Sequence, residues 1–438
     1  MNIRFNNSLL EFLRAAIHAG VPVDEGTVVL RDGVGRLLLA RKDVSNSTSI
    51  ENDLRAALDG YAAPVVLVTG GAAERLLKDP TLMDQEVELD GVIYQYKYAD
   101  RRIVGADWLE APAAHSARPR IVFGSLKGGV GRSTALTVFA ADLARNGKKV
   151  LAIDLDLEAP GIGYMLLPAS DEVGVDRRPR FGALDYLIEN SLGGVKDSEL
   201  VDFVGVSPFL EGSIDVVPAV GRDTDEHPET MIAKLSRALV EDEANGSFVS
   251  FSAQVREMVE RFEGRGNYDV VLIDARAGLA EISAGPLTNL GAEVLLFGTD
   301  QPQTFQGYSY LLAHLSRVTR DYSWAEHVVF VHGKAPSAAS KRQPFRDKIY
   351  DLCSNFLYEE ETLGLDGQVI EVDFSPGPNE KGPGVPHDVL HIGFHPDYDA
   401  FDPVGDISQL DPEVYSGPFG SFLSRAWELS GLDSGESA

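Results

Sequence analysis

A glycine-rich segment between an apolar run and a helical pattern carries the clearest chemistry in the sequence. Residues 123–134 read FGSLKGGVGRST, between a predicted strand at 120–125 and a predicted helix at 132–146. Glycines let the backbone curl so that successive N–H groups point into one concavity, and a helix N-terminus behind it attracts anions. The hydroxyl of Ser133 is suited to Mg²⁺. We expect a cradle for nucleotide phosphates, formed by Gly128, Gly129, Val130, Gly131, Arg132, Ser133 and Thr134.

The segment departs from the general phosphate-loop pattern G-x-x-x-x-G-K-[ST] at two positions. Leu126 stands in place of the first glycine, and Arg132 stands in place of the lysine. Lys127, followed by two glycines, resembles the deviant Walker A motif of the ParA/MinD superfamily of P-loop ATPases, in a KGGVGR variant. The resemblance implies that Lys127 reaches the phosphates, often those of the partner subunit, in a homodimer formed through the nucleotide site. A glycine-rich turn that binds no ligand is the alternative.

Two aspartates, Asp154 and Asp156, follow a second predicted strand at 150–154. Cleavage of a γ-phosphate needs a carboxylate that orients a water in line with the scissile bond. The resemblance to the ParA/MinD superfamily assigns this role to Asp156. Asp154 has two interpretations, which the sequence leaves open: a ligand of Mg²⁺, or a carboxylate that caps the strand end and supports the phosphate loop.

A third strand pattern, at 270–274, ends in Asp274 and is similar to a Walker B motif. A carboxylate at that position can hold Mg²⁺, directly or through water. The resemblance also implies that the backbone N–H of Gly278 senses the γ-phosphate. Arg276 stands between them, and it either stabilises charge near the phosphates or forms an ion pair with Asp156 or Glu158.

Histidines occur at two further places of interest. His332 ends a predicted strand at 328–332, where relatives often carry an asparagine that reads adenine; it either contacts the base or is satisfied by backbone. His387, His391 and His395 recur every four residues, which on a helix would form a metal-binding face. The prolines and glycine among them argue against a helix there, and therefore against a metal site.

From residue 120 onward, apolar strand patterns alternate with helical ones. Strands are predicted at 121–124, 150–154, 214–218, 270–274, 294–297 and 328–332. This alternation predicts an α/β fold with a doubly wound, mostly parallel sheet and a ligand at the carboxyl ends of its strands. The stretch 165–265 is longer than one crossover needs, and helices predicted at 229–245 and 251–264 indicate a helical insertion or lobe.

The patterns divide the chain into three parts. Residues 1–112 are expected to form an N-terminal α+β domain of unknown role, with hairpins around Asp32-Gly33 and Asp90-Gly91. An Ala/Pro-rich linker at 110–119 leads into a P-loop ATPase domain at 120–360. Residues 361–438 are expected to form an irregular C-terminal extension packed on that domain, with a strand at 389–395. Its last helix is expected to dock through an apolar face made of Phe419, Phe422, Leu423, Ala426 and Trp427.

The composition restricts the partners. A net charge of −28 repels nucleic acid and anionic lipid unless a basic patch intervenes, and we interpret the basic clusters at 177–180 and 341–348 as solvated charges or phosphate contacts. The single cysteine, Cys353, excludes an intrachain disulfide and a CxxC site. No signal-peptide pattern and no apolar run of about 20 residues is present. We expect a cytoplasmic protein that binds neither nucleic acid nor membrane.

These features together predict an ATPase that uses ATP and Mg²⁺. Arginine at position 132 keeps the charge of the lysine but is planar and longer, so we expect hydrolysis slower than about 10 s⁻¹. Lys127, Arg132 and Asp156 are the candidate catalytic residues, and the protein would be a nucleotide-gated dimerisation switch. Family-level analogy places it with a partner protein in a bacterial multi-gene system of the defence type. A nucleotide-binding scaffold that does not hydrolyse ATP is the alternative.

Overall fold

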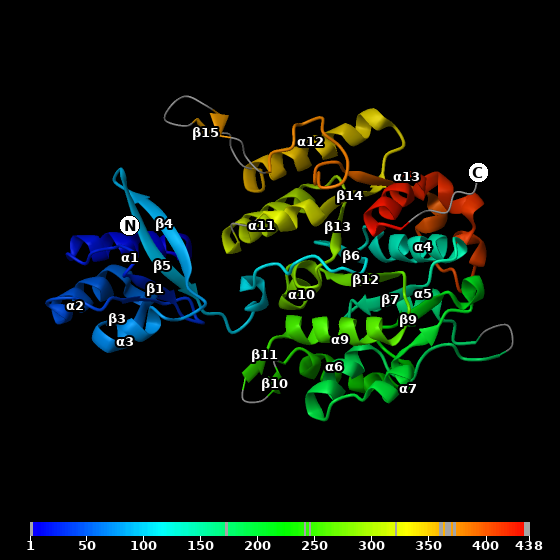
Figure 1. Ribbon diagram of the computed structural model, residues 1–438, viewed down its shortest axis with the longest axis horizontal. Helices are drawn as coiled ribbons and strands as arrows, with labels where there is room; N and C mark the ends of the chain where they lie inside the picture. Colours follow the sequence, from blue (N-terminus) through cyan, green and yellow to red (C-terminus); the bar gives the residue numbers. More distant parts are fainter. Residues whose placement is uncertain are drawn as a thin grey trace. The chain divides into compact units, whose positions relative to one another are not determined.

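The structure is a computed structural model that describes residues 3–170, 174–240, 242–244, 247–319, 322–358, 362–363, 369–370 and 374–432. Contacts within the chain divide it into two units, Met1–Ala106 and Asp107–Ala438 (Figure 1). No helix among the residues described is long and apolar enough to cross a lipid bilayer.

The N-terminal unit is a small α+β fold with its own core. Its elements are α1 (Phe5–His18), β1 (Val28–Arg31), β2 (Leu37–Ala40), α2 (Ser47–Leu58), β3 (Ala62–Val68), α3 (Gly70–Leu76), β4 (Met83–Leu89) and β5 (Val92–Asp100). The sheet order is β3-β2-β1-β5-β4. Both predicted hairpins are confirmed, because β1 pairs antiparallel with β2 and β4 with β5. Asp90 and Gly91 both take positive φ angles, as a tight hairpin turn requires.

The second unit is built on one eight-stranded sheet. The strands, in their order across the sheet, are β17 (Leu390–Gly393), β14 (Val328–Ala335), β13 (Glu293–Gly298), β6 (Arg120–Ser125), β12 (Val270–Ala277), β7 (Val150–Leu155), β9 (Ile214–Val217) and β8 (Gly205–Val206). Every neighbouring pair is parallel except β8 with β9. The predicted doubly wound, mostly parallel α/β sheet is confirmed, including the strand expected within 389–395.

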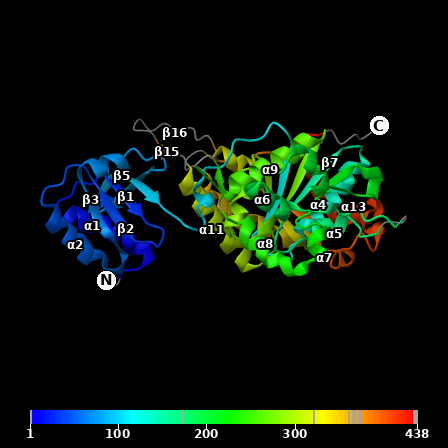
Figure 2. The same cartoon turned by 90° about the horizontal axis from the view of Figure 1, so that it is seen from below.

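Helices cover both faces of this sheet. On one face lie α4 (Arg132–Arg145), α5 (Ile162–Leu166) and α13 (Pro412–Ser430). On the other lie α6 (Ala183–Leu192), α9 (Phe251–Arg265), α10 (Ala284–Thr288), α11 (Pro302–Val318) and α12 (Ala339–Phe356). Figure 2 shows these layers from a second direction. Residues of the central strands alternate between the two cores, as in Ile121 and Val122 of β6, so that these strands are buried on both faces.

The stretch 165–265 differs from the prediction in one place. The helix expected at 229–245 is wrong in its extent: the helix α8 spans Met231–Ala238. Two short strands, β10 (Asp242–Ala244) and β11 (Ser247–Val249), follow it and pair antiparallel. The helix predicted at 251–264 is confirmed as α9, which begins with the Ser250 hydroxyl accepting the N–H of Ala253. A further short α-helix of this stretch is α7 (Arg222–Glu226).

The segment with linker-like composition lies against the second unit. The N–H of Ala113 donates to the carbonyl of Thr288, and the N–H of Ser116 donates to that of Gly291. Just before it, the carboxylate of Asp107 accepts two hydrogen bonds from Ser252, each 2.7 Å long. Residues 110–119 are therefore held along much of their length rather than extended through solvent.

Helix α13 packs on α4 and β17, and its five predicted apolar residues are all buried. The Trp427 indole N–H also donates to Asp142 on α4, at 2.6 Å. The helix therefore uses its apolar face to complete the core of the second unit.

Candidate functional site

The phosphate loop joins the C-terminus of β6 to the N-terminus of α4, at the positions predicted. Gly129 and Gly131 take φ angles of +75° and +88°, a backbone conformation that residues with a Cβ rarely adopt. Gly128 and Gly129 are exposed, whereas Val130 is buried and fixes the loop to the core. The loop thus presents its backbone to solvent at the carboxyl edge of the sheet.

Arg132, the first residue of α4, bridges two carboxylates, one within β12 and one just after β7. Its Nε lies 2.5 Å from Asp274 Oδ1 at β12, and its Nη2 lies 2.6 Å from Asp156 Oδ2 just after β7. Its Nη1 also donates to the hydroxyl of Ser125. The Ser133 hydroxyl donates to the other oxygen of Asp274, at 2.5 Å. Four of the predicted site residues therefore meet in one network beneath the loop.

This network is buried, which sets its electrostatics. The side chain of Arg132 is 8 % exposed and that of Asp274 is 1 % exposed. Burial lowers the pKa of Arg132, but the carboxylates of Asp274 and Asp156 more than offset this, so its pKa lies above the ordinary value. Burial also raises the pKa of Asp274, against the opposing effects of Arg132 and Ser133. The guanidinium is the cation that compensates these two carboxylates.

Asp154 has a different set of partners. One oxygen accepts the N–H of Asp156, and the other accepts the N–H groups of Gly161 and Ile162. Burial, and then the nearby charge of Asp274, raises the pKa of Asp154 to about 7. These contacts hold the loop that carries Asp156, and they leave the role of Asp154 as a metal ligand a prediction.

The remaining predicted residues surround this network. Lys127 is exposed on the loop, and its ammonium lies 2.5 Å from the side-chain oxygen of Gln301. Gly278, with φ of +106°, donates its N–H to the carbonyl of Ser125. Arg276 pairs with Glu158 at 2.6 Å. Of the two interpretations of Arg276, the structure therefore contains the ion pair.

A hollow lies beside the phosphate loop. Val130, Gly131 and Thr134 line one side of it, and Phe394 and Tyr398, after β17, are on another. Lys334, paired with Asp399 at 3.1 Å, also lines it. The side chain of Phe394 is an exposed aromatic next to the loop, where the parallel pairing of β17 with β14 places it. The sequence indicates that residues 396–401, which follow, could frame the base, and Tyr398 of that segment lines the hollow.

His332 is not among the residues that line this hollow. Its ring stacks on Phe345 with centroids 4.1 Å apart and is 2 % exposed. Burial lowers the pKa of His332 to about 4, so the ring is neutral at neutral pH. Contact of His332 with a base remains a prediction.

The three histidines spaced by four residues do not converge. His387 bonds to the Tyr358 hydroxyl, the ring of His391 bonds to Ser421, and His395 lies near Asp397. None of them belongs to the one group of potential metal ligands found among the residues described.

Comparisons with known proteins agree with the phosphate loop. A family model described as "AAA domain" matches residues 119–162. No curated protein matches the sequence.

Among solved structures, MinD from Pyrococcus horikoshii OT3, complexed with Mg-ADP, is 19% identical over 53% of this chain and 77% of its own, with a TM-score of 0.35. A McdA variant of Cyanothece in complex with ATP is 13% identical over 73% of this chain and 98% of its own, with a TM-score of 0.42. A putative plasmid partition protein of Borrelia burgdorferi B31, bound to AMPPNP, is 15% identical over 72% of this chain and 99% of its own, with a TM-score of 0.42. At these identities the likeness concerns the fold. These solved structures are ParA/MinD-type P-loop ATPases, the family that residues 127–134 resemble.

Proposed function

We propose that this chain is a nucleotide-gated dimerisation switch that binds ATP with Mg²⁺ and hydrolyses the ATP slowly. The observation that supports this most is the bridge from Arg132, in the phosphate loop, to Asp156 and Asp274. It links the residue that would hold the phosphates to the two carboxylates that the chemistry would use.

The bridge suggests how nucleotide binding would be sensed. A triphosphate in the loop offers Arg132 a third anion, of high charge, in competition with the two aspartates. When the guanidinium moves toward the phosphates, Asp156 loses its ion pair. Its carboxylate is then free to orient a water for in-line attack on the γ-phosphate. Binding and activation are therefore coupled through one side chain.

Ser133 and Asp274 are the residues that would hold Mg²⁺. A hydroxyl and a carboxylate are oxygen ligands of the kind that this ion prefers, and these two already lie 2.5 Å apart. The ion would supply charge neutralisation at the phosphates. Asp154 is the weaker candidate, because both of its oxygens accept backbone N–H groups.

The hollow beside the loop is where the base would lie. Phe394 and Tyr398 offer aromatic faces there, next to Gly131 and Thr134. An aromatic face stacks on any base, which suits affinity more than selection among bases. The base would then be recognised by residues after β17 rather than by His332.

Dimerisation is attributed to the exposed face of the loop. Lys127 points its ammonium to the surface beside Gln301, where a second subunit can approach it. The N-terminal unit, which has a core of its own, is the element that would convey the nucleotide state to a partner protein in a multi-gene system.

Nucleotide titration and steady-state turnover test this proposal on the wild type and on Asp156→Asn. The wild type should bind ATP–Mg²⁺ and hydrolyse it more slowly than about 10 s⁻¹. Asp156→Asn should bind at least as tightly, since Arg132 loses one competing carboxylate, and its turnover should fall to background. Binding without any turnover by the wild type would favour the non-hydrolysing scaffold. Absence of binding would contradict the proposal.

A further inference from the structure

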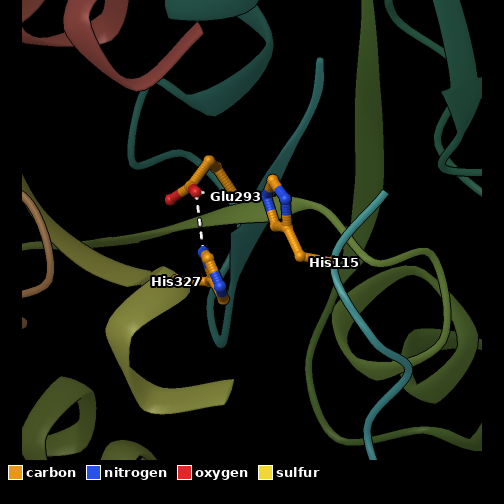
Figure 3. Close-up of side chains that lie close together, drawn as sticks. All are labelled: His115, Glu293 and His327. Atoms are coloured by element: carbon orange, nitrogen blue, oxygen red, sulfur yellow. Dashed lines mark hydrogen bonds and ion pairs between the residues drawn. The ribbon is translucent and has the colours of Figure 1, made fainter. Parts of the chain in front are cut away.

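We propose a second metal site, for a zinc ion, at the opposite edge of the sheet from the phosphate loop. Its ligands are His115, Glu293 and His327, whose potential ligand atoms all lie within 4.8 Å of one another. Figure 3 shows the three side chains together. The site is independent of the proposed nucleotide switch, and none of its residues belongs to the network around Arg132.

The three residues come from segments far apart in the sequence. Glu293 is the first residue of β13, and His327 ends the 3-10 helix η7 (Ser323–His327), just before β14. Because β13 and β14 are neighbouring parallel strands, their amino ends meet at one edge of the sheet. His115 comes from the segment 110–119, which lies along that edge.

The separations of the ligand atoms are close to what a tetrahedral ion needs. Glu293 Oε1 lies 2.8 Å from His327 Nδ1 and 3.2 Å from His115 Nε2. Bonds of ~2.0–2.2 Å to a tetrahedral zinc ion place neighbouring ligand atoms about 3.4 Å apart. The two imidazole rings stack with centroids 4.1 Å apart and planes at 19°. Because near-parallel rings do not direct their nitrogen lone pairs at one point, one ring would turn out of the stack to ligate the ion together with the other histidine and Glu293.

The donor set selects the kind of ion. Two imidazole nitrogens and one carboxylate suit zinc and related transition metals, whereas magnesium and calcium prefer oxygen ligands alone. Three protein ligands leave one tetrahedral position, which a water would fill. The histidine side chains are 36 % and 34 % exposed, so an ion and its water can reach them, while Glu293 is mostly buried at 12 %.

The backbone already holds His115 in place. The N–H groups of Ala113 and Ser116, on either side of it, donate to the carbonyls of Thr288 and Gly291, at 2.8 and 2.7 Å. A ligand fixed in this way loses little conformational freedom when the ion binds. A bound zinc ion would link segment 110–119 to the start of β13. This segment follows the N-terminal unit in the chain.

Cobalt and zinc titrations of the untagged, metal-stripped full chain test the site. Co²⁺, a spectroscopic substitute for zinc, should bind with one equivalent and give the visible bands of tetrahedral coordination. Zn²⁺ should displace it, raise the melting temperature and slow hydrogen exchange in peptides covering 110–119. Excess Mg²⁺ should leave the cobalt bands unchanged, since its preferred ligands are oxygens.

Three variants decide whether these residues form the site. His115→Ala/His327→Ala and Glu293→Gln should lose the tetrahedral cobalt signal and the shift in melting temperature. Glu293→Gln keeps the shape of the side chain, so a folded variant is available if the double variant is unstable. The control is His227→Ala, which alters an exposed histidine paired with Glu229 and should bind as the wild type does. No tetrahedral signal from the wild type, or a signal that persists in both ligand variants, would overturn the proposal.

Discussion

At the scale of single residues, Arg132 has two roles that oppose each other. Its charge is needed to compensate Asp156 and Asp274, which are both buried. The guanidinium of Arg132 can contact phosphates only when it leaves these two carboxylates. A buried ion network therefore holds these residues together without nucleotide, and its disruption on binding is the step by which we propose that turnover is slowed.

We expect Arg132→Ala to lower the free energy of unfolding by about 3–5 kcal/mol, because it leaves two buried carboxylates without their cation. The matched control is Arg276→Ala, whose pair with Glu158 has side chains 26 % and 40 % exposed. That change should cost less than about 1 kcal/mol. Urea denaturation of the nucleotide-free chains measures both values. Equal costs for the two variants would show that the bridge does not stabilise the fold.

Asp154 gives the stability a pH dependence whose sign follows from its pKa. Burial raises this pKa to about 7 in the folded chain, whereas an unfolded aspartate titrates near ~3.9. At a pH between these two pKa values, Asp154 of the folded wild type binds a proton that it does not hold in the unfolded chain. The contribution of protonated Asp154 to the stability of the folded chain is therefore greatest at low pH, and it is lost as the pH rises through about 7.

The comparison with Asp154→Asn isolates this effect, because the variant cannot titrate at that position. We expect the stability of the wild type relative to the variant to be greater at about pH 5.5 than at about pH 8. Urea unfolding at both pH values, with all other groups in common, measures the difference. A difference that does not change with pH would mean that Asp154 stays ionised throughout.

At the scale of elements, the strand-loop-helix unit from β6 to α4 lies where the sequence predicts it. Its signals are local in the sequence: an apolar strand, two glycines that take the positive φ angles of the loop, and a helix that begins directly after the second of them. Helix α8 was predicted too long because helix-forming residues continue past Ala238, whereas pairing of β10 with β11 ends it. The dipeptide Asn245-Gly246 in the sequence is a hairpin signal that the prediction did not use.

Helix α13 provides the test at this scale. The Phe422 ring is fully buried and has the rings of Phe123, Phe139 and Phe297 as neighbours, with centroids 6.1–6.4 Å away. We expect Phe422→Ala to lower the free energy of unfolding by about 3–5 kcal/mol. Phe394→Ala, the same change at a ring that is 58 % exposed, should stay within about 0.5 kcal/mol. A similar small loss for both would mean that α13 is not part of the cooperative core.

At the scale of the whole molecule, the contacts that matter most join residues distant in sequence. Strand ends predict that Asp154, Asp156 and Asp274 gather at one edge of the sheet, because parallel strands bring their carboxyl ends together. The cluster of His115, Glu293 and His327 has no such signal. It needs the neighbouring positions of β13 and β14 and the docking of a segment whose composition is that of a linker.

The net charge of the chain also bears on which partners it can bind. In the basic cluster at 177–180, Arg178 is paired with Asp176 and Asp225, and Arg180 is paired with Asp223. These pairs reduce the local positive charge that a nucleic-acid surface would require. That this acidic chain does not bind nucleic acid therefore stays a prediction.

The most direct test of the switch is the mass of the protein in solution, measured by light scattering without nucleotide, with ADP–Mg²⁺ and with ATP–Mg²⁺. We predict a doubling of mass that requires ATP, is lost in Lys127→Ala and lasts longer in Asp156→Asn, because the latter keeps the loop but cannot orient the attacking water. The same mass in every nucleotide state, with ATP bound, would contradict a dimerisation switch.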